Sequence, residues 1–241
     1  MNFQDKVAII TGASSGIGYH TAKLLAKNGA IVALAARSKD KLELLAKELP
    51  NALVIPTDMT KIVDITRMVS LTKKQYGRID ILINCAGQGY DAYVEDINND
   101  LFHHVFDLDL LGPVIAMQQV IPIMRKQKSG TIVNISSGTA LMTLPGMSAY
   151  ASLKQALAKI SLTAHIELQK DSISVIVVYP FITDTDFEKH TIRSGKEHEW
   201  TGDGNRKLPP ADSPEFVAEQ ILAGIQSGES EVYVHEWMHK R

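Results

Sequence analysis

The chain has 241 residues, of which 45% are hydrophobic and 22% charged, and these ordinary globular proportions exclude a disordered chain, a collagen and a coiled coil. The formal net charge of −2 at pH 7 gives no electrostatic case for a nucleic-acid or anionic-membrane partner. The single cysteine, Cys85, cannot pair within the chain, no apolar run reaches about 18 residues and no signal sequence is visible, so we expect a cytoplasmic protein without a membrane span.

Along the first third of the chain, short apolar runs alternate with longer stretches in which apolar residues recur at helical spacing. The runs have the length of strands, and glycine or proline follows the longer stretches, which is typical of strands alternating with helices. We predict strands at 6–11, 31–36, 52–56 and 79–84, with helices at 16–29, 38–49 and 60–76 between them.

The same alternation continues to the end of the chain. A long helical region at 100–128 is interrupted at Gly112-Pro113, which indicates two consecutive helices or one helix with a break. Beyond it we predict strands at 130–136, 173–179 and 231–234, with helices at 148–170 and 213–227.

Strands without polar alternation, each followed by a helix, indicate a parallel sheet that is covered on both faces. We therefore predict a single α/β domain over residues 1–241, with a doubly wound parallel sheet of seven strands and helices on both faces. The polar segment 180–212 shows no periodicity and is too long for an ordinary connection. We interpret it as a functional flap, and the alternative is a variable surface insertion.

The first predicted strand leads directly into the turn Thr11-Gly-Ala-Ser-Ser-Gly-Ile-Gly18. A glycine-rich turn between a strand and a helix lets a pyrophosphate approach the main chain and directs the helix N-terminus at its negative charge. The spacing is GxxxGxG and not the commoner GxGxxG, and the alternative is a purely structural turn. The predicted nucleotide-binding residues of the turn are Gly12, Ser14, Ser15, Gly16, Ile17 and Gly18.

The end of the second predicted strand bears on the choice of cofactor. An acidic residue there would accept a hydrogen bond from the adenosine 2′-hydroxyl and select NAD. The chain has Ala36 followed by Arg37 instead, and a guanidinium can pair with a 2′-phosphate. We therefore predict NADP(H), and the alternative is a solvated arginine at the start of a helix.

A tyrosine and a lysine stand four residues apart near the start of the helix predicted at 148–170. This spacing places Tyr150 and Lys154 on one face. A free phenol, with a pKa of about 10, is a poor acid–base group at neutral pH, and a nearby ammonium stabilises the phenolate. Ser137 follows a strand and so falls at the same sheet edge as the glycine turn. Together they predict a reactive site for proton transfer.

With these motifs in order, the chain resembles the short-chain dehydrogenases/reductases over nearly its whole length. The resemblance implies a single-domain Rossmann fold and hydride transfer between NADP(H) and a small-molecule carbonyl or alcohol substrate. It rests on TGASSGIG at 11–18, Asp58, NCAG at 84–87, Ser137, YASLK at 150–154, and Pro180 with Thr185.

The resemblance also implies roles for the matching residues. Ser137 is expected to hold the substrate oxygen, Tyr150 to transfer the proton, and Lys154 to bind the ribose and lower the pKa of the tyrosine. The remaining cofactor contacts implied are Asp58 at the adenine, Asn84, Ala86 and Gly87 beside the ribose, and Pro180, Thr183 and Thr185 toward the carboxamide.

Three positions depart from the family pattern. The usual NNAG reads Asn84-Cys85-Ala86-Gly87, and the usual Pro-Gly after the sixth strand reads Pro180-Phe181. The helix motif NxxG reads Asp109-Leu-Leu-Gly112, so that Asp109 stands at the fourth catalytic position in place of an asparagine. Aspartate keeps the acceptor of the amide, loses its donor and can ionise.

The resemblance further favours a homodimer or homotetramer, formed through the helices at 100–128 and 148–170. Leu157, Ile160 and Leu162 add apolar surface beyond what one sheet face covers. No metal site is expected, because His103 and His104 are helix neighbours that point in different directions.

A different function on the same fold is a non-catalytic NADP-binding sensor or scaffold, and a further alternative is an epimerase or dehydratase. The presence of Ser137, Tyr150 and Lys154 together favours the oxidoreductase.

The segment 138–148 is mostly apolar, which favours a moderately hydrophobic carbonyl substrate. His190, His198 and Trp200 are further candidates in the flap.

Overall fold

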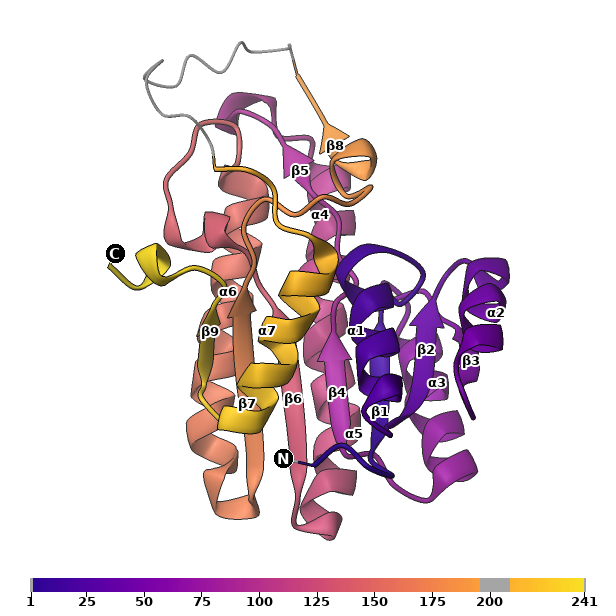
Figure 1. Ribbon diagram of the computed structural model, residues 1–241. Coiled ribbons are helices and arrows are strands. Elements are labelled where there is room, and N and C mark those ends of the chain that lie inside the picture. The colour runs from indigo at the N-terminus through magenta and orange to yellow at the C-terminus, as the bar shows by residue number, and fades with distance from the viewer. Residues whose placement is uncertain (1, 196–208, 241) are drawn as a thin grey trace.

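The computed structural model describes residues 2–195 and 209–240, which are built around one seven-stranded sheet (Figure 1). Its strands are all parallel, in the order β3-β2-β1-β4-β6-β7-β9. The strands are β1 (Val7–Thr11), β2 (Ile31–Ala36), β3 (Leu53–Pro56), β4 (Ile81–Asn84), β6 (Gly130–Ile135), β7 (Ile173–Tyr179) and β9 (Glu231–Tyr233). The predicted doubly wound parallel sheet is confirmed.

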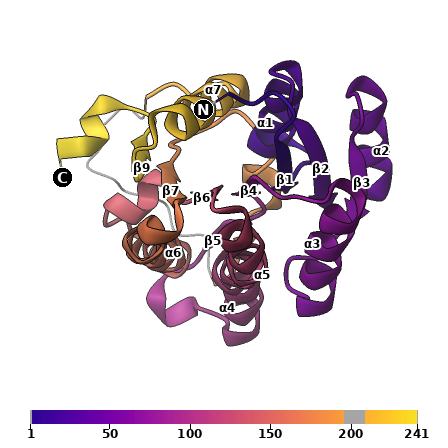
Figure 2. The same ribbon diagram turned by 90° about the horizontal axis from the view of Figure 1, so that it is seen from below.

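Helices cover both faces of this sheet (Figure 2). One face carries α1 (Gly16–Lys27), α2 (Lys39–Glu48) and α7 (Pro214–Ser227), and the other carries α3 (Ile62–Tyr76), α5 (Gly112–Gln127) and α6 (Ser148–Leu168). Successive strand residues point to opposite faces, so Ala8 and Ile10 pack in one core and Ile9 in the other. Both faces are buried, which is why the strands are apolar without alternation.

The long helical region contains a widened turn. α4 (Asn99–Phe106) passes into α5 through one turn of π-helix, Asp107–Leu111. The sequence predicted two consecutive helices, or one helix with a break, at Gly112-Pro113. The structure has two consecutive α-helices, the second opening at Gly112, but the π-helical turn joins them without a gap. Pro113 has no N–H to donate to the preceding turn, and the widened π turn stands just before it.

By length and composition, the run Asn99–Gln127 could also cross a membrane. Half of its most apolar window is buried inside the protein. Residues of α5 such as Val120 and Met124 pack in the core on the sheet, so its apolar character has an explanation in the fold.

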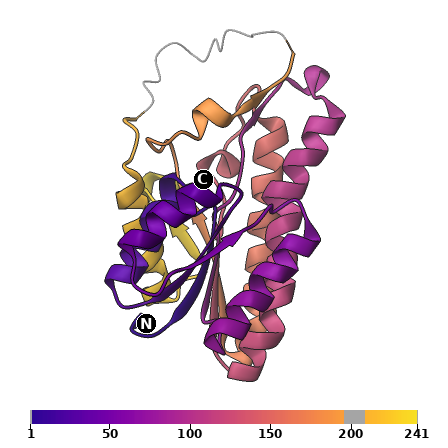
Figure 3. The same cartoon turned by 90° about the vertical axis from the view of Figure 1, so that its right-hand side faces the viewer.

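A second, two-stranded sheet lies beyond the carboxyl ends of the main strands and was not predicted (Figure 3). It pairs β5 (Tyr90–Asp91) with β8 (Ile192–Arg193) in parallel. The hydroxyl oxygen of Tyr90 accepts from the backbone N–H of Asn98 at 2.8 Å and lies 2.7 Å from Ser194 Oγ. Single turns of 3-10 helix are η1 (Val94–Asp96), η3 (Gly138–Leu141), η4 (Gln169–Asp171), η5 (Glu188–His190) and η6 (Glu236–Lys240).

The predicted flap, 180–212, is described at 180–195 and at 209–212. Two backbone hydrogen bonds close its base: Asp184 N donates to Asp212 O and Asp212 N donates to Ile182 O, both at 2.8 Å. Two of the flap residues singled out in the sequence, His198 and Trp200, lie outside the described residues.

The apolar residues of α6 are used differently from the prediction. Leu157 is buried, and Leu162 packs against a core cluster beside Tyr179. Leu157, Ile160 and Leu162 were expected to add apolar surface that the sheet does not cover. Of the three, only Ile160 is exposed. The expectation for Leu157 is therefore wrong, because α6 buries it against its own chain, and the homodimer or homotetramer stays a prediction.

Asp80, at the start of β4, joins three strands at the end opposite the site. Its carboxylate accepts from Val7 N at 2.9 Å and from two guanidinium nitrogens of Arg78 at 2.7 and 2.6 Å. Its backbone N–H donates to Val7 O, and its carbonyl accepts from Thr131 N, both at 2.8 Å. Asp80 is buried, so these bonds are shielded from water.

We predict that Asp80→Ala lowers the free energy of unfolding by about 2–4 kcal/mol, because it leaves a buried N–H and a guanidinium without their acceptor. Urea denaturation measures this change. Glu43→Ala is the matched control: Glu43 pairs with Lys39 on the surface of α2, and such a pair contributes less than about 1 kcal/mol. Equal losses in both variants would contradict the role given to Asp80.

Candidate active site

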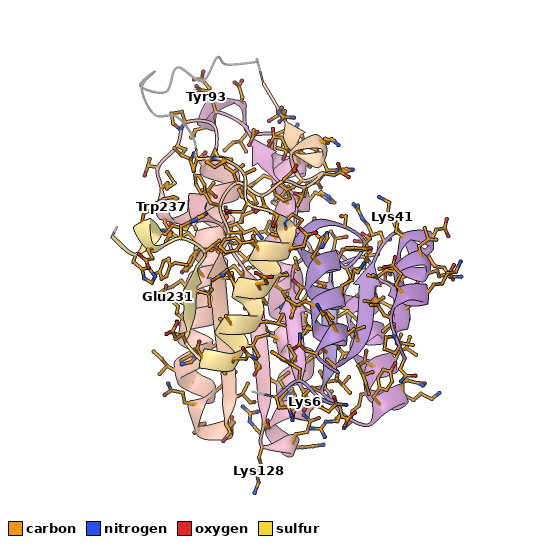
Figure 4. All side chains as sticks on the ribbon, in the orientation of Figure 1. Lys6, Lys41, Tyr93, Lys128, Glu231 and Trp237 are labelled. Atoms are coloured by element: carbon orange, nitrogen blue, oxygen red, sulfur yellow. The ribbon has the colours of Figure 1, made fainter. Side chains whose placement is uncertain are left out.

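A cavity of about 1160 Å³ opens at the carboxyl ends of the main strands. Its walls come from the turn after β1, the end of β2, the loops after β3, β4 and β6, the start of α6 and the described part of the flap. Figure 4 labels Tyr93 and Lys41 toward this end of the molecule, and Lys6 and Lys128 at the opposite end. Parallel strands bring their carboxyl ends to one edge, which is why segments far apart in sequence meet here.

Most of the residues that the sequence singled out line this cavity. They are Gly12, Ser14, Ser15, Gly16, Ile17, Gly18, Arg37, Asp58, Ala86, Gly87, Ser137, Tyr150, Lys154, Pro180, Thr183 and Thr185. Asn84 and Asp109 are not on its wall. Asn84 is buried beneath the site, where its amide donates to Asn134 Oδ1 at 2.8 Å, and Asp109 lies behind Lys154.

The glycine turn leaves the N-terminus of α1 open toward the cavity. Gly12 has a φ of +69°, and a Cβ there would lie 2.8 Å from Ala86 N, so only glycine fits. The N-cap residue Ser15 makes no side-chain capping bond, and no acidic residue stands in the first turn of α1. The backbone N–H groups at this helix start and the positive end of the helix dipole therefore suit a phosphate.

Ser137 is held by a neighbour that the sequence analysis did not single out. Its Oγ accepts from Thr139 Oγ1 at 2.9 Å and from Thr139 N at 3.1 Å. Both lone pairs of the hydroxyl are then occupied, so its own proton is directed outward. Tyr150 lies on the same cavity wall, and the Ser137 side chain acts to lower the pKa of its phenol. Ser137 is thus arranged as a donor.

Lys154 lies at the back of the same wall and is almost completely buried. Its Nζ donates to Ile135 O at 3.0 Å, lies 3.0 Å from Asp109 Oδ2, and stands 5.7 Å from the centre of the Tyr150 ring. Burial is the largest single influence and acts to lower the pKa of this ammonium. The charge and proximity of Asp109, together with Tyr150 and Cys85, outweigh burial in sum, so the pKa is raised. The lysine is therefore a cation with a buried counter-charge.

The pKa of Tyr150 is raised, whereas the spacing to Lys154 predicted that it would be lowered. Burial raises the pKa of the phenol to about 12; Lys154 acts to lower it and Asp109 acts to raise it. The lysine does favour the phenolate, as expected, but desolvation and the neighbouring carboxylate outweigh it. In the protein alone, Tyr150 is a protonated phenol at neutral pH.

Asp109 is fixed by a residue outside the predicted motifs. Its Oδ1 accepts from the backbone N–H of Gln88 at 2.9 Å, and the side-chain amide of Gln88 donates to His190 O in the flap at 2.7 Å. Lys41 is a further missed residue, since it lines the cavity from the first turn of α2, four residues after Arg37. A lysine four residues after Arg37 is a signal the sequence did offer, whereas nothing local marks Gln88 or Thr139.

No group of three or more histidine, cysteine, aspartate or glutamate side chains suited to a metal ion occurs within residues 2–195 and 209–240. Cys85 lies beside the site, and burial raises the pKa of its thiol to about 12. The chemistry of the described site is therefore carried by a phenol, a hydroxyl and an ammonium–carboxylate pair.

Comparison with known proteins shows the family. A model described as short chain dehydrogenase matches residues 6–195, and an uncharacterized oxidoreductase of Bacillus subtilis (strain 168) is 35% identical over 191 residues, 78% of this chain and 74% of the relative. The chain belongs to the short-chain dehydrogenase family, and the protein is an oxidoreductase.

Solved structures agree with this assignment. A short-chain dehydrogenase from Streptomyces avermitilis superposes with a TM-score of 0.88 at 27% identity, covering 98% of this chain and 90% of that one. An alcohol dehydrogenase from the archaeon Thermococcus sibiricus, complexed with 5-hydroxy-NADP, superposes with a TM-score of 0.81 at 26% identity, covering 95% and 96%.

We predict that Thr139→Val lowers kcat about tenfold, because the nearly isosteric change removes the hydroxyl donor that orients the proton of Ser137. The measurement is steady-state turnover of a carbonyl substrate with NADPH. Thr139→Ser keeps the hydroxyl and is expected to retain kcat. Unchanged kcat in Thr139→Val would show that the hydrogen bond to Ser137 has no catalytic consequence.

Proposed function

We propose that the protein is an NADP(H)-dependent reductase or dehydrogenase that interconverts a small-molecule carbonyl compound and its alcohol. The observation that carries this proposal is that Ser137, Tyr150 and Lys154 meet on one wall of the cavity whose other end is the open N-terminus of α1. One end suits a phosphate and the other suits proton transfer to oxygen.

The cavity fits a nicotinamide dinucleotide. Its volume of about 1160 Å³ exceeds the roughly 300–1,000 Å³ of an ordinary small-ligand pocket, so it has room for a dinucleotide and a small substrate. Within the described residues, Lys154 donates one N–H to Ile135 O and forms an ion pair with Asp109 Oδ2 at 3.0 Å. An ammonium has three N–H donors, which leaves one for a ribose hydroxyl.

The cofactor supplies or accepts the hydride, and the protein handles the proton. In reduction, Ser137 donates a hydrogen bond to the substrate oxygen and polarises the carbonyl. As negative charge develops on that oxygen, the Tyr150 O–H bond breaks and its proton forms the alcohol O–H. The resulting phenolate is stabilised by Lys154 and regains a proton from solvent; alcohol oxidation runs the same steps in reverse.

Two cations on the cavity wall support NADP(H) over NAD(H). Arg37 and Lys41 both line the cavity near the end of β2, where an acidic residue would select the 2′-hydroxyl. Asp58, a carboxylate of the wall that interacts electrostatically with Arg37, has its Oδ1 occupied by Thr60 N at 3.0 Å and Thr60 Oγ1 at 2.8 Å. The pair of cations is arranged for a 2′-phosphate.

The substrate end favours a moderately hydrophobic carbonyl compound. Leu144, Met147, Phe181 and Phe187 line it, and the Phe187 ring stands 5.9 Å from that of Tyr150. Phe181, which replaces the usual glycine, packs edge-on against Trp237 with ring centres 5.1 Å apart. Apolar rings around one polar oxygen-binding point suit a ketone or aldehyde with hydrocarbon substituents.

The alternative of a non-catalytic NADP-binding sensor or scaffold gains no support from the comparisons, which point to an oxidoreductase. A scaffold would not need Thr139 to direct the Ser137 proton outward. NADPH consumption with a panel of ketones, aldehydes and diketones separates the two functions, because a sensor would bind NADPH without consuming it.

We predict that Tyr150→Phe lowers kcat at least about 10²–10⁴-fold, since the ring remains but the proton donor is lost, while NADPH binding persists. Turnover and NADPH fluorescence measure the two effects. Tyr76→Phe is the control, because Tyr76 bonds only to Asn51 O at the far end of α3 and is expected to retain activity. Near-normal turnover by Tyr150→Phe would overturn the assignment.

We predict that the unmodified protein binds NADPH more tightly than NADH, and that Arg37→Ala weakens NADPH binding by about 1–3 kcal/mol with little effect on NADH. Isothermal titration calorimetry gives both affinities. Lys39→Ala is the matched control, because Lys39 begins α2 two residues after Arg37, pairs with Glu43 at 3.3 Å and is not on the cavity wall. Equal affinities of the unmodified protein for the two cofactors would refute the preference.

A further inference from the structure

The ion pair behind Tyr150 sets this chain apart from the family pattern, in which a neutral asparagine occupies the position of Asp109. The Asp109 side chain is fully buried, and its Oδ2 lies 3.0 Å from Nζ of Lys154, whose side chain is 5% exposed. A buried carboxyl group therefore stands within contact distance of the ammonium that neighbours the reactive phenol.

The surroundings of Asp109 suit a carboxylate and not an amide. Oδ1 faces the N–H of Gln88 and Oδ2 faces the ammonium of Lys154, so both oxygens face donors. An ionised carboxylate only accepts hydrogen bonds, whereas an asparagine would turn its NH2 group against one of the two donors. Burial raises the pKa of Asp109, whereas Lys154 and the Gln88 N–H act to lower it. The two partners' pKa directions thus differ in what they favour, and the arrangement of donors around both oxygens is what supports a charged pair.

Charges in this site act on each other strongly because little water screens them. Tyr150 faces Lys154, Asp109, Cys85 and Ser137, and Asp109 also faces His104 of α4. Burial keeps Cys85 as a neutral thiol. The charged groups beside Tyr150 are thus one ammonium, which stabilises the phenolate, and one carboxylate, which destabilises it.

We propose that Asp109 is a positioning residue that fixes Lys154 and cancels much of its charge at Tyr150, so that the phenol stays protonated throughout the neutral range. The proposal rests on the proposed function and deepens it. The protonated phenol is the form that donates to a carbonyl oxygen, so reduction runs at neutral pH without prior ionisation. Alcohol oxidation needs the phenolate, so its rate rises with pH to an inflection far above neutrality.

The first test is the pH dependence of kcat/KM for alcohol oxidation with NADP⁺, using the alcohol formed from the best carbonyl substrate of the panel. In Asp109→Asn, we expect the inflection to fall by at least about one pH unit, because the ammonium then acts on the phenol without a counter-charge. Asp109→Glu keeps the charge and is expected to keep the high inflection. An unchanged or higher inflection in Asp109→Asn would overturn the proposal.

A second measurement needs no substrate. The ultraviolet absorbance of tyrosinate is followed against pH for each protein and for the same protein carrying Tyr150→Phe, and the difference isolates Tyr150. The difference titration is expected to shift downward in Asp109→Asn by the same amount as the kinetic inflection. A purely structural role predicts no shift, because the asparagine oxygen still accepts from Gln88.

Two further variants keep the test decisive. Asp109→Ser is neutral and smaller, and it replaces Asp109→Asn if circular dichroism shows that the latter is unfolded; the same downward shift is expected. His104→Gln must leave the inflection in place, and a shift as large as that of Asp109→Asn would assign the effect to the histidine and overturn the proposal.

The two measurements also separate the proposal from the function on which it rests. If no member of the panel is turned over, the proposed function fails, while the tyrosinate titration still decides whether Asp109 controls Tyr150. If turnover is found and depends on Tyr150, but Asp109→Asn leaves both pH profiles unchanged, the function stands and the role of Asp109 is wrong.

Discussion

The hydroxyl group of Thr11 joins the ends of two neighbouring strands, and the site depends on that junction. Thr11 ends β1 and is buried; its Oγ1 accepts from Cys85 N at 3.0 Å and from Ala86 N at 3.1 Å. The loop after β4 is therefore drawn across the glycine turn, which explains why a Cβ on Gly12 would meet Ala86. The same loop continues to Gln88, whose N–H holds Asp109, so the nucleotide end and the reactive end share one backbone segment.

Burying a charged pair costs desolvation energy, which the protein offsets with directed hydrogen bonds. Lys154 donates to Ile135 O and Asp109 accepts from Gln88 N, while the contact between Lys154 Nζ and Asp109 Oδ2 is an ion pair. Space around the pair is equally constrained. A Cβ on Gly87 would lie 2.8 Å from Asp109 Oδ2 and 3.3 Å from Lys154 Nζ. The glycine at this position is therefore required by the ion pair as well as by the cavity.

Much of the architecture was predictable because the periods of strands and helices are local. The order and types of the main elements follow from apolar runs and amphipathic stretches, and Tyr150 and Lys154 follow from helical spacing. Ser137 was predictable from its place after a strand. These features need only the pattern of nearby residues and the geometry of a parallel sheet.

The remaining features depend on contacts between segments far apart in the chain. The pairing of β5 with β8 joins residues about one hundred positions apart, and two-residue strands carry no periodic signal. The inward turn of Asn84 depends on Asn134 in the neighbouring strand. The raised pKa of Tyr150 depends on how deeply the phenol is buried and on the carboxylate beside Lys154, neither of which the spacing of Tyr150 and Lys154 encodes.

The π-helical turn at Asp107–Leu111 has a consequence for how this sequence tolerates deletions. A π turn accommodates one residue more than a regular turn, and each residue of an α-helix advances the direction of its side chains by about 100°. Deleting one residue of this turn would restore a regular helix and would leave the sequences of α4 and α5 intact. The carboxylate of Asp109 would then rotate away from Lys154. A one-residue deletion, of a kind that a loop readily absorbs, would here separate the two charges while sparing most of the fold.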